Sequence, residues 1–281
     1  MAKPSLLGQI SVVTGAAGGI GAALATRLGE AGADVWALDV DESGLAARKD
    51  EGERYGRKVE TRVVDVRDNA AMAAVAAEVA AACGASLKRL GVWVNNAGIA
   101  ATTPFHGTPV EDFDRVMAVN LGGVINGTRA ALAVMEQAGF GTIVNVASMA
   151  GHLPAPMMTS YCASKHGVVG FSRSLQAELA LRSSPVRLVL VSPGFIDTAI
   201  IRKGEAMGFP PWLSFMLATP TTVADETIAA IKSGKPEIFP SMNAKVMRAM
   251  YRLLPRATVR SSRVLLAKSW KDLVLNRFDL P

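Results

Sequence analysis

Short apolar runs alternate with helical patterns along most of this 281-residue chain. The apolar runs predict strands at 10–13, 35–40, 59–64, 92–94, 142–146 and 187–191, with a short one at 237–239. Amphipathic or alanine-rich patterns predict helices from 19 to 32, 42 to 55, 68 to 83, 110 to 138 and 161 to 181. Such alternation is typical of an α/β protein with a doubly wound parallel sheet and helices on both faces. We therefore predict a single domain over residues 6–240.

A polar residue or a glycine stands at the end of nearly every predicted strand. These residues are Gly15, Asp39, Asp65, Asn96, Ser148 and the pair Pro193-Gly194. The carboxyl ends of parallel strands lie along one edge of a sheet, and ligands bind beyond that edge. Their joint placement favours one binding site over a set of unrelated loop residues.

The first predicted strand leads into a glycine-rich turn, Thr14-Gly15-Ala16-Ala17-Gly18-Gly19-Ile20-Gly21, which opens a helix. Glycines permit a tight turn and a close approach of backbone to phosphate, and a helix N-terminus favours negative charge. The spacing is T-G-x-x-x-G-x-G, which differs from the G-x-G-x-x-G of the standard dinucleotide fingerprint. We predict a pyrophosphate site; a simple turn is the alternative.

Asp39 ends the second predicted strand about 20 residues after the glycines, where a carboxylate can accept hydrogen bonds from an adenosine ribose. A carboxylate would repel the 2′-phosphate of NADP, and positions 16, 17, 18, 40 and 41 hold no arginine or lysine. We therefore predict NAD as the cofactor and regard NADP as less favoured. The alternative role for Asp39 is a helix N-cap.

Tyr161 and Lys165 lie four residues apart on a predicted helix and so share one face. A nearby cation favours a phenolate, so we expect Lys165 to lower the pKa of Tyr161 and make it a better acid or base near neutral pH. Tyrosine and lysine at this spacing also occur on ordinary amphipathic helices. Ser148 precedes Tyr161 by 13 residues, where its hydroxyl can steady a developing oxyanion or merely cap a turn.

These motifs, in this order, resemble those of the short-chain dehydrogenase/reductase family. The matching segments are Thr14-Gly15-x-x-x-Gly19-Ile20-Gly21, Asp65-Val66, Asn95-Asn96-Ala97-Gly98, Asn120, Ser148, Tyr161-x-Ala163-Ser164-Lys165 and Pro193-Gly194-x-x-x-Thr198. They cover residues 6 to about 200 and imply a Rossmann-like fold, with NAD- or NADP-dependent chemistry on CH–OH groups.

The resemblance also implies roles for individual residues. Tyr161 is the general acid/base, Ser148 steadies the substrate oxygen, Lys165 also bonds the nicotinamide ribose, and Asn120 holds a water that links Lys165 to solvent. Asp65 and Val66 contact the adenine, Asn96 lies along the adenosine ribose, and Ile196 and Thr198 hold the nicotinamide carboxamide. The full predicted cofactor set is Gly15, Gly18, Gly19, Ile20, Gly21, Asp39, Asp65, Val66, Asn96, Ala97, Gly98, Tyr161, Lys165, Pro193, Gly194, Ile196 and Thr198.

Composition and charge narrow the remaining possibilities. Two cysteines make no disulfide framework, and neither a secretory signal nor an apolar run of about 18 residues is evident, so we expect a cytoplasmic protein. The three histidines, His106, His152 and His166, lack metal-ligand spacing, so we expect no catalytic metal. We read Cys162 as a packing residue rather than a nucleophile.

The basic charge gathers at one end of the chain. Residues 242–281 contain nine Lys/Arg and two acids, whereas the preceding 241 residues carry a net charge of −1. The body has no basic stripe, so we expect no nucleic-acid partner. We read 241–281 as a basic amphipathic extension that can either lie on an anionic membrane surface or pack on the body or a partner subunit.

Residues 200–222 are rich in methionine and aromatic side chains, and we expect them to form a substrate lid. With Leu153, Met157 and Met158, the lid would present an apolar wall to a hydrophobic secondary alcohol or ketone, such as a steroid, retinoid, terpenoid or acyl compound. Ordinary core packing is the alternative for each of these residues.

We expect a homodimer through the helices that contain Asn120 and Tyr161, or a homotetramer. The leading function is an NAD-dependent oxidoreductase. The alternatives are a non-catalytic dinucleotide-binding sensor or scaffold and an epimerase or dehydratase.

Overall fold

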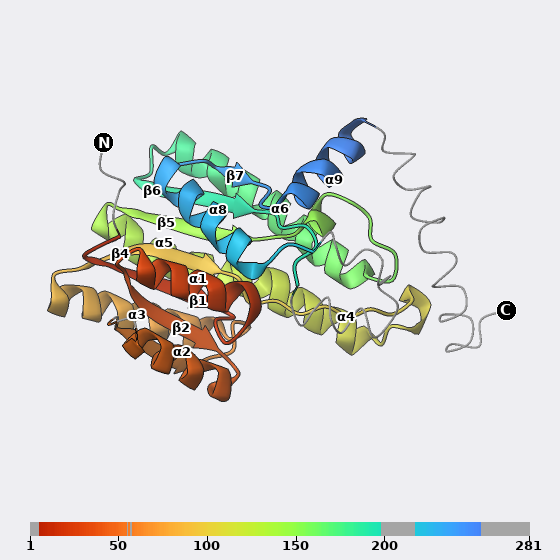
Figure 1. Ribbon diagram of the computed structural model, residues 1–281. Helices are drawn as coiled ribbons and strands as arrows, with labels where there is room; N and C mark the ends of the chain where they lie inside the picture. Colours follow the sequence, from red (N-terminus) through yellow and green to blue (C-terminus); the bar gives the residue numbers. More distant parts are fainter. Residues whose placement is uncertain (1–5, 55, 57, 198–216, 254–281) are drawn as a thin grey trace.

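A computed structural model describes residues 6–54, 56, 58–197 and 217–253. Seven parallel strands form one sheet in the order β3-β2-β1-β4-β5-β6-β7 (Figure 1). They are β1 Gln9–Thr14, β2 Asp34–Asp39, β3 Val59–Val63, β4 Arg89–Asn95, β5 Gly141–Val146, β6 Val186–Val191 and β7 Glu237–Ile238. The strand order reverses direction between β1 and β4, so the predicted doubly wound, Rossmann-like sheet is confirmed.

Helices cover both faces of the sheet (Figure 1). The α-helices are α1 Gly19–Glu30, α2 Glu42–Arg54, α3 Asn69–Ser86, α4 Val110–Met117, α5 Gly123–Ala138, α6 Thr159–Leu181, α8 Pro220–Ser233 and α9 Met242–Leu253. Two short 3-10 turns, η1 Phe105–Gly107 and η3 Met149–Gly151, and a π-helical turn, η2 Ala118–Gly122, complete the described elements.

The core has two layers because successive residues of a strand point to opposite faces of the sheet. Val13 packs in the layer under α1, α2 and α8, whereas its neighbour Val12 packs in the layer under α3, α5 and α6. Strands buried on both faces account for the nearly continuous apolar runs in the sequence. Each large apolar side chain so buried stabilises the fold by about 1.5–3 kcal/mol.

The predicted single helix over 110–138 is wrong in one respect. The structure divides it into α4 and α5, with the π-helical turn η2 between them. Single π-helical turns within α-helices often occur at functional sites. Here the turn carries Asn120, whose fully buried side chain bonds the backbone of Ile99.

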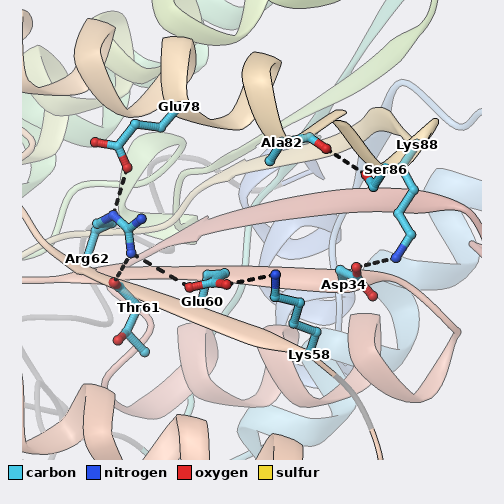
Figure 2. Close-up of polar contacts among 9 residues, drawn as sticks. All are labelled: Asp34, Lys58, Glu60, Thr61, Arg62, Glu78, Ala82, Ser86 and Lys88. Atoms are coloured by element: carbon cyan, nitrogen blue, oxygen red, sulfur yellow. Dashed lines mark hydrogen bonds and ion pairs between the residues drawn. The ribbon is translucent and has the colours of Figure 1, made fainter. Parts of the chain in front are cut away.

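Strand β3 lies at the edge of the sheet, and charged side chains cover that edge (Figure 2). Arg62 donates from Nε to Glu78 Oε2 of α3 at 2.8 Å, and its guanidinium lies 4.8 Å from the centre of the Trp36 ring. Lys88, just before β4, pairs with Asp34 at the start of β2. Such pairs contribute about 0–1 kcal/mol each, but charges on an edge strand also oppose pairing with another chain.

Among the described helices, α3 has the length and apolar composition of a membrane span, with a mean hydropathy of 1.3. The helix instead packs on the sheet through Met72, Val75, Ala76 and Val79. Asp68 caps its N-terminus by accepting hydrogen bonds from the amides of the second and third helical residues. We therefore regard α3 as a layer helix of the fold.

The final described helix, α9, packs on the body of the protein. Its Ala244, Met247 and Tyr251 join Met149, Leu153 and Phe239 in a small apolar cluster. Of the two arrangements expected for the start of the basic extension, packing on the body therefore holds for α9. The remainder of the extension, residues 254–281, lies outside the described residues.

Candidate active site

The glycine-rich turn joins β1 to α1 and requires glycine at two places. Gly15 has a φ of +67°, and a Cβ atom there would lie 2.8 Å from the Cα of Ala97. A Cβ atom on Gly21 would lie 1.9 Å from the carbonyl oxygen of Gly15. Any larger residue at either position would force the turn away from the neighbouring backbone.

The turn is open on the side where a phosphate would approach. Gly18 precedes α1, no side chain caps the helix there, and a Cβ atom on Gly18 would meet nothing within 4 Å. The first amide groups of α1, from Gly19, Ile20 and Gly21, therefore have no side-chain acceptor. An uncapped helix N-terminus behind a glycine turn binds phosphate groups well. These residues fit the pyrophosphate of a dinucleotide.

Asn96 braces this turn from the end of β4. Its Nδ2 donates to the carbonyl oxygens of Thr14 and Gly15, at 3.1 and 3.2 Å. The Thr14 hydroxyl in turn accepts from the amides of Asn96 and Ala97. Both sets of bonds tie the β4 end to the glycine turn, so the side chain of Asn96 shapes the cofactor site. Its predicted position along the adenosine ribose stays a prediction.

Asp39 lies at the carboxyl end of β2, beside the glycine turn. Its Oδ2 accepts from the Ala17 amide at 2.9 Å, and its Oδ1 accepts from the amides of Val40 and Asp41. The N-cap role belongs to Asp41, whose Oδ1 accepts from the Ser43 and Gly44 amides. Asp39 is therefore held at the edge of the turn and is not the cap of α2.

Asp65 and Val66 follow β3 and are held by their own local contacts. Asp65 pairs with Arg67 at 2.6 Å, and this hydrogen-bonded partner lowers the pKa of the Asp65 carboxyl. Val66 is buried against Gly123 at the start of α5, where a Cβ atom would approach its side chain to 2.5 Å. The predicted adenine contacts of this pair stay predictions.

The candidate catalytic side chains come from β5 and α6. Ser148 follows the end of β5 and starts η3, where its Oγ accepts from the Ala150 amide at 3.1 Å. Tyr161 and Lys165 lie one turn apart on α6, and the Tyr161 hydroxyl hydrogen-bonds to Ser148. Lys165 is almost fully buried, and its Nζ donates to the carbonyl oxygen of Val146 at 2.9 Å. The fold thus places the serine, tyrosine and lysine together.

The pKa values of this group differ from the expectation. Burial raises the pKa of Tyr161, and the hydrogen bond with Ser148 opposes this rise only in part. Burial also lowers the pKa of Lys165, to about 8. The Lys165 Nζ lies 5.7 Å from the centre of the Tyr161 ring. The expectation that Lys165 lowers the pKa of Tyr161 is therefore wrong for the protein alone, because desolvation of the phenolate is the larger effect.

Asn120 ties the loop after β4 to α6. Its Oδ1 accepts from the Ile99 amide at 2.8 Å, and its Nδ2 donates to the Ile99 carbonyl oxygen and to Ser164 Oγ, at 2.9 and 3.0 Å. Ser164 Oγ donates to the Tyr161 carbonyl oxygen at 2.8 Å. The amide of Asn120 thus positions the backbone near Gly98 and Tyr161. Its predicted water relay to Lys165 stays a prediction.

The Pro193-Gly194 turn contacts both η3 and α9. The Pro193 carbonyl oxygen accepts from the Met149 amide at 2.7 Å, next to Ser148. Gly194 lies so close to Asn243 that a Cβ atom would approach its Oδ1 to 2.3 Å. Ile196 is buried in the core and forms a β-bridge with Ala218. Thr198 and residues 200–216 of the expected lid lie outside the described residues.

A buried polar network beneath the site went unpredicted. Asn95 Nδ2 donates to Thr128 Oγ1 and to Asn145 Oδ1, and Asn145 Nδ2 donates to Ser172 Oγ at 3.0 Å. The Trp93 indole donates to Asn95 Oδ1 at 2.9 Å. These contacts join β4, β5, α5 and α6. The available signal was Asn145, which stands between two valines of β5, because a buried amide requires hydrogen-bond partners.

The second unpredicted group surrounds His152. Its Nε2 lies 2.9 Å from Ser192 Oγ at the end of β6, and burial lowers its pKa to about 4. The pair links η3 to the strand that leads into Pro193.

Among the described residues, no group of three or more His, Cys, Asp or Glu side chains could hold a metal ion. Burial raises the pKa of the Cys162 thiol, in keeping with its predicted packing role.

Comparison with known proteins decides the family. Residues 9–207 match the family model of the short chain dehydrogenases. The chain belongs to the short-chain dehydrogenase/reductase family. The glycine turn and the N-terminus of α1 described above fit the phosphates of a dinucleotide.

Two curated relatives show how this short-chain dehydrogenase/reductase compares in length. "Probable oxidoreductase EphD" of Mycobacterium tuberculosis is 35% identical over 270 residues, which cover 90% of this chain and 44% of EphD. The chain therefore spans less than half the length of that relative. The 3-oxoacyl-(acyl-carrier-protein) reductase FabG of Thermotoga maritima is 37% identical over 198 residues, which cover 70% of this chain and 78% of FabG.

Two solved structures share the fold. A metagenomic short-chain oxidoreductase in complex with NADP is 33% identical with a TM-score of 0.70, and the match covers 85% of this chain and 100% of that one. A short-chain dehydrogenase/reductase from Burkholderia phymatum in complex with NAD is 27% identical with a TM-score of 0.77, and the match covers 94% of this chain and 96% of that one. One relative thus binds NADP and the other NAD.

Proposed function

We propose that this protein interconverts a hydrophobic secondary alcohol and its ketone with NAD as the cofactor. The observation that carries the proposal is the cluster of Ser148, Tyr161 and Lys165 at the carboxyl end of β5, on the same edge of the sheet as the uncapped N-terminus of α1. Oxidation of an alcohol removes a proton from oxygen and a hydride from carbon. The bound nicotinamide would take or give the hydride, and the protein must handle the proton.

Tyr161 would exchange that proton with the substrate oxygen. Burial keeps the phenol protonated, which is the form required to give a proton to a ketone oxygen. Ser148 can hold the substrate oxygen through its hydroxyl while charge develops there. Lys165 is the buried cation of the site, and the Val146 carbonyl oxygen orients its Nζ.

The preference for NAD rests on Asp39. Its carboxylate is fixed beside the glycine turn by the Ala17 amide, at the end of the strand where the adenosine ribose would lie. A 2′-phosphate at this place would bring negative charge next to a carboxylate. Among the described residues, no arginine or lysine follows Asp39 before Arg48 to offset that repulsion.

The proposal of an apolar substrate is based on the residues between η3 and α6. Met157 and Met158 are half-buried and lie just before Tyr161. Met157 adopts a left-handed backbone conformation with a φ of +66°, and its carbonyl oxygen accepts from the Thr103 amide at 3.0 Å. Strained residues of this kind cluster at ligand sites. Leu153 is buried and packs against α9, and its place in the apolar wall stays a prediction.

We also propose a homodimer through α4, α5 and α6. Helix α4 contacts α6, and η2, which carries Asn120, contacts all three helices. Sedimentation equilibrium of the full chain tests this arrangement. A mass of two chains supports it, whereas a monomer at micromolar concentration contradicts it.

The test of the activity is a screen of hydrophobic secondary alcohols and ketones, followed by the absorbance of the reduced nicotinamide with NAD and NADP in parallel. Polyols of equal chain length serve as matched polar substrates. The proposal predicts higher kcat/KM for the apolar member of each pair and for NAD. Faster turnover of the polyols, or higher kcat/KM with NADP, would contradict it.

A further inference from the structure

Helix α9 has two apolar faces, and the body of the protein covers only one of them. The covered face contains Ala244, Met247 and Tyr251, which pack on η3 and Phe239. Asn243 at its start donates to the Phe195 carbonyl oxygen at 2.9 Å and also lies against Gly194. These contacts fix α9 to the loops that border the active site.

The second apolar face points away from the body. Met242, Val246 and Met250 follow at intervals of four residues, and Leu253 comes three residues later, so the four side chains share one side of the helix. Their exposed fractions are 73%, 43%, 50% and 78% in chain order. We call these four residues the outer stripe of α9. An amphipathic helix ordinarily buries such a row.

A basic groove of about 400 Å³ runs along the side of α9. Its charged lining consists of Lys235, Lys245, Arg248 and Arg252 with Glu226 and Glu237. Glu226 pairs with Lys245, and Glu237 pairs with Arg173. Within the part of the chain that the structure describes, Lys235, Arg248 and Arg252 pair with no carboxylate, so the groove offers cations to an anionic ligand.

Arg248 is held in place within this groove. Its guanidinium lies 4.1 Å from the centre of the Phe239 ring, which is itself part of the cluster under α9. The cation–π contact fixes the position of the charge while it leaves the guanidinium on the exposed helix surface. The groove and the outer stripe therefore lie side by side on one short helix.

We propose that the outer stripe and the basic groove dock this protein on an anionic lipid surface. Apolar side chains beside Lys and Arg on one helix match the boundary between acyl chains and acidic headgroups. A second copy of the chain fits less well, because a two-fold contact through α9 would bring Arg248 and Arg252 of both copies together. Residues 254–281 contain six Lys/Arg and two acids, so this segment carries the same sign of charge as the groove.

Docking in this way would place the active site next to the lipid surface. The covered face of α9 contacts Met149 and Leu153, which follow Ser148 in the chain, and Asn243 contacts the loop after β6. A hydrophobic substrate dissolved in the lipid would then have a short path to the site. The docking proposal does not depend on which substrate the enzyme uses.

Cosedimentation of the full chain with vesicles tests the proposal. The vesicles contain phosphatidylcholine alone or phosphatidylcholine with phosphatidylglycerol. The apolar variant is Val246→Ser with Met250→Ser, and the charge variant is Lys235→Gln with Arg252→Gln. We expect binding only to the phosphatidylglycerol vesicles, weaker binding at high salt, and partition constants lowered about ten-fold by the apolar variant and about twenty-fold by the charge variant.

Matched control variants change the same kinds of side chain elsewhere. Leu87→Ser with Leu181→Ser removes two apolar residues that are 95% and 88% exposed, and Lys49→Gln with Arg54→Gln removes two exposed cations of α2. The controls should bind vesicles like the wild type, and far-ultraviolet circular dichroism verifies that every variant is folded. Equal binding by the α9 variants and the controls would overturn the proposal.

Three other results would also overturn it. Absence of binding to phosphatidylglycerol vesicles at low salt would exclude lipid as the occupant. A change from dimer to monomer in the apolar variant, with no effect on vesicle binding, would show that the outer stripe is an interface between copies. Binding of soluble polyglutamate that requires both the outer stripe and the groove, without vesicle binding, would instead indicate an acidic protein partner.

Discussion

The Nζ of Lys165 donates a hydrogen bond to the carbonyl oxygen of Val146 at 2.9 Å. This bond ties Lys165 of α6 to the end of β5, two residues before Ser148. The lysine is thereby positioned while most of its solvation is lost. Burial of this charge destabilises the fold, although the proposed catalysis requires a cation at this place.

Replacement of Lys165 by methionine should therefore stabilise the fold and abolish turnover. Its pKa of about 8, against an ordinary 10.5, means that the folded protein holds the proton less tightly than the unfolded chain. Burial of the charged Lys165 therefore costs the folded protein about 3 kcal/mol, which the methionine variant would regain. Loss of the hydrogen bond to Val146 offsets about 1 kcal/mol of this stabilisation. We expect the free energy of unfolding at pH 7 to rise by about 1–2 kcal/mol, as measured by urea denaturation.

The pH dependence separates this effect from ordinary packing. Between pH 8 and 10.5 the unfolded chain binds more protons at Lys165 than the folded protein, so wild-type stability should rise with pH through this window. The methionine variant should lack this contribution, whereas Lys49→Met on the exposed face of α2 should retain it. A variant that is less stable than wild type at pH 7 would contradict the reasoning.

Asn120→Leu should destabilise the fold by about 2–4 kcal/mol, because it leaves both backbone groups of Ile99 without their partner. Asn126→Leu is a matched change on α5, where the side chain donates to the Val66 and Arg67 carbonyl oxygens from a partly exposed position. We expect that variant to lose less than half as much stability. Equal losses in chemical denaturation would show that the π-helical turn has no special structural role.

The surroundings of Asn120 could not be predicted from the sequence. The apolar and polar pattern of 110–138 predicts a helix correctly, but it does not reveal the π-helical turn that directs Asn120 toward Ile99. That turn depends on a contact between residues 21 positions apart. Local patterns encode local geometry, and this geometry is set by a tertiary contact.

The doubly wound parallel sheet, by contrast, was predicted from the sequence. Buried strands such as β5 are mainly apolar, and a polar residue such as Ser148 follows them at the carboxyl edge of the sheet. This pattern predicted the parallel sheet and the edge along which the candidate site residues lie. The pKa of Tyr161 could not be predicted in the same way. The expectation weighed the charge of Lys165 alone, whereas the depth of burial, which only the folded structure supplies, has the larger effect.

His152 should make the fold less stable in mild acid. Burial lowers its pKa from 6.5 to about 4, and the charges of Arg173 and Arg248 contribute in the same direction while Glu237 opposes them. Between pH 6.5 and 4 the unfolded chain binds more protons than the folded protein, so stability falls as the pH falls. The loss should reach about 2–3 kcal/mol near pH 4.

His152→Gln tests this prediction, because glutamine can still bond the Ser192 hydroxyl but does not titrate in this range. The free energy of unfolding of the variant should vary less between pH 6.5 and 4. His106→Gln, at an exposed histidine of η1, is the matched control and should keep the wild-type slope. Identical slopes in all three proteins would exclude His152 as the cause.

Asp39→Asn should weaken the preference for NAD over NADP by about ten-fold, since it removes the charge that faces a 2′-phosphate. Asp41→Asn removes the same charge two residues away, from the cap of α2, and should leave the preference unchanged. The ratio of kcat/KM values for the two cofactors measures the effect. Equal ratios in the two variants would mean that Asp39 does not face the adenosine ribose.

Turnover of the Tyr161→Phe variant tests the central claim most directly. The change removes one hydroxyl, and Tyr251→Phe on α9 is the matched control. General acid/base catalysis by Tyr161 predicts a fall in kcat of about 10²–10⁴-fold, with NAD affinity close to that of the wild type and full activity in the control. A Tyr161→Phe enzyme that turns over its alcohol or ketone at the wild-type rate would contradict the assignment of Tyr161 as the proton donor and acceptor.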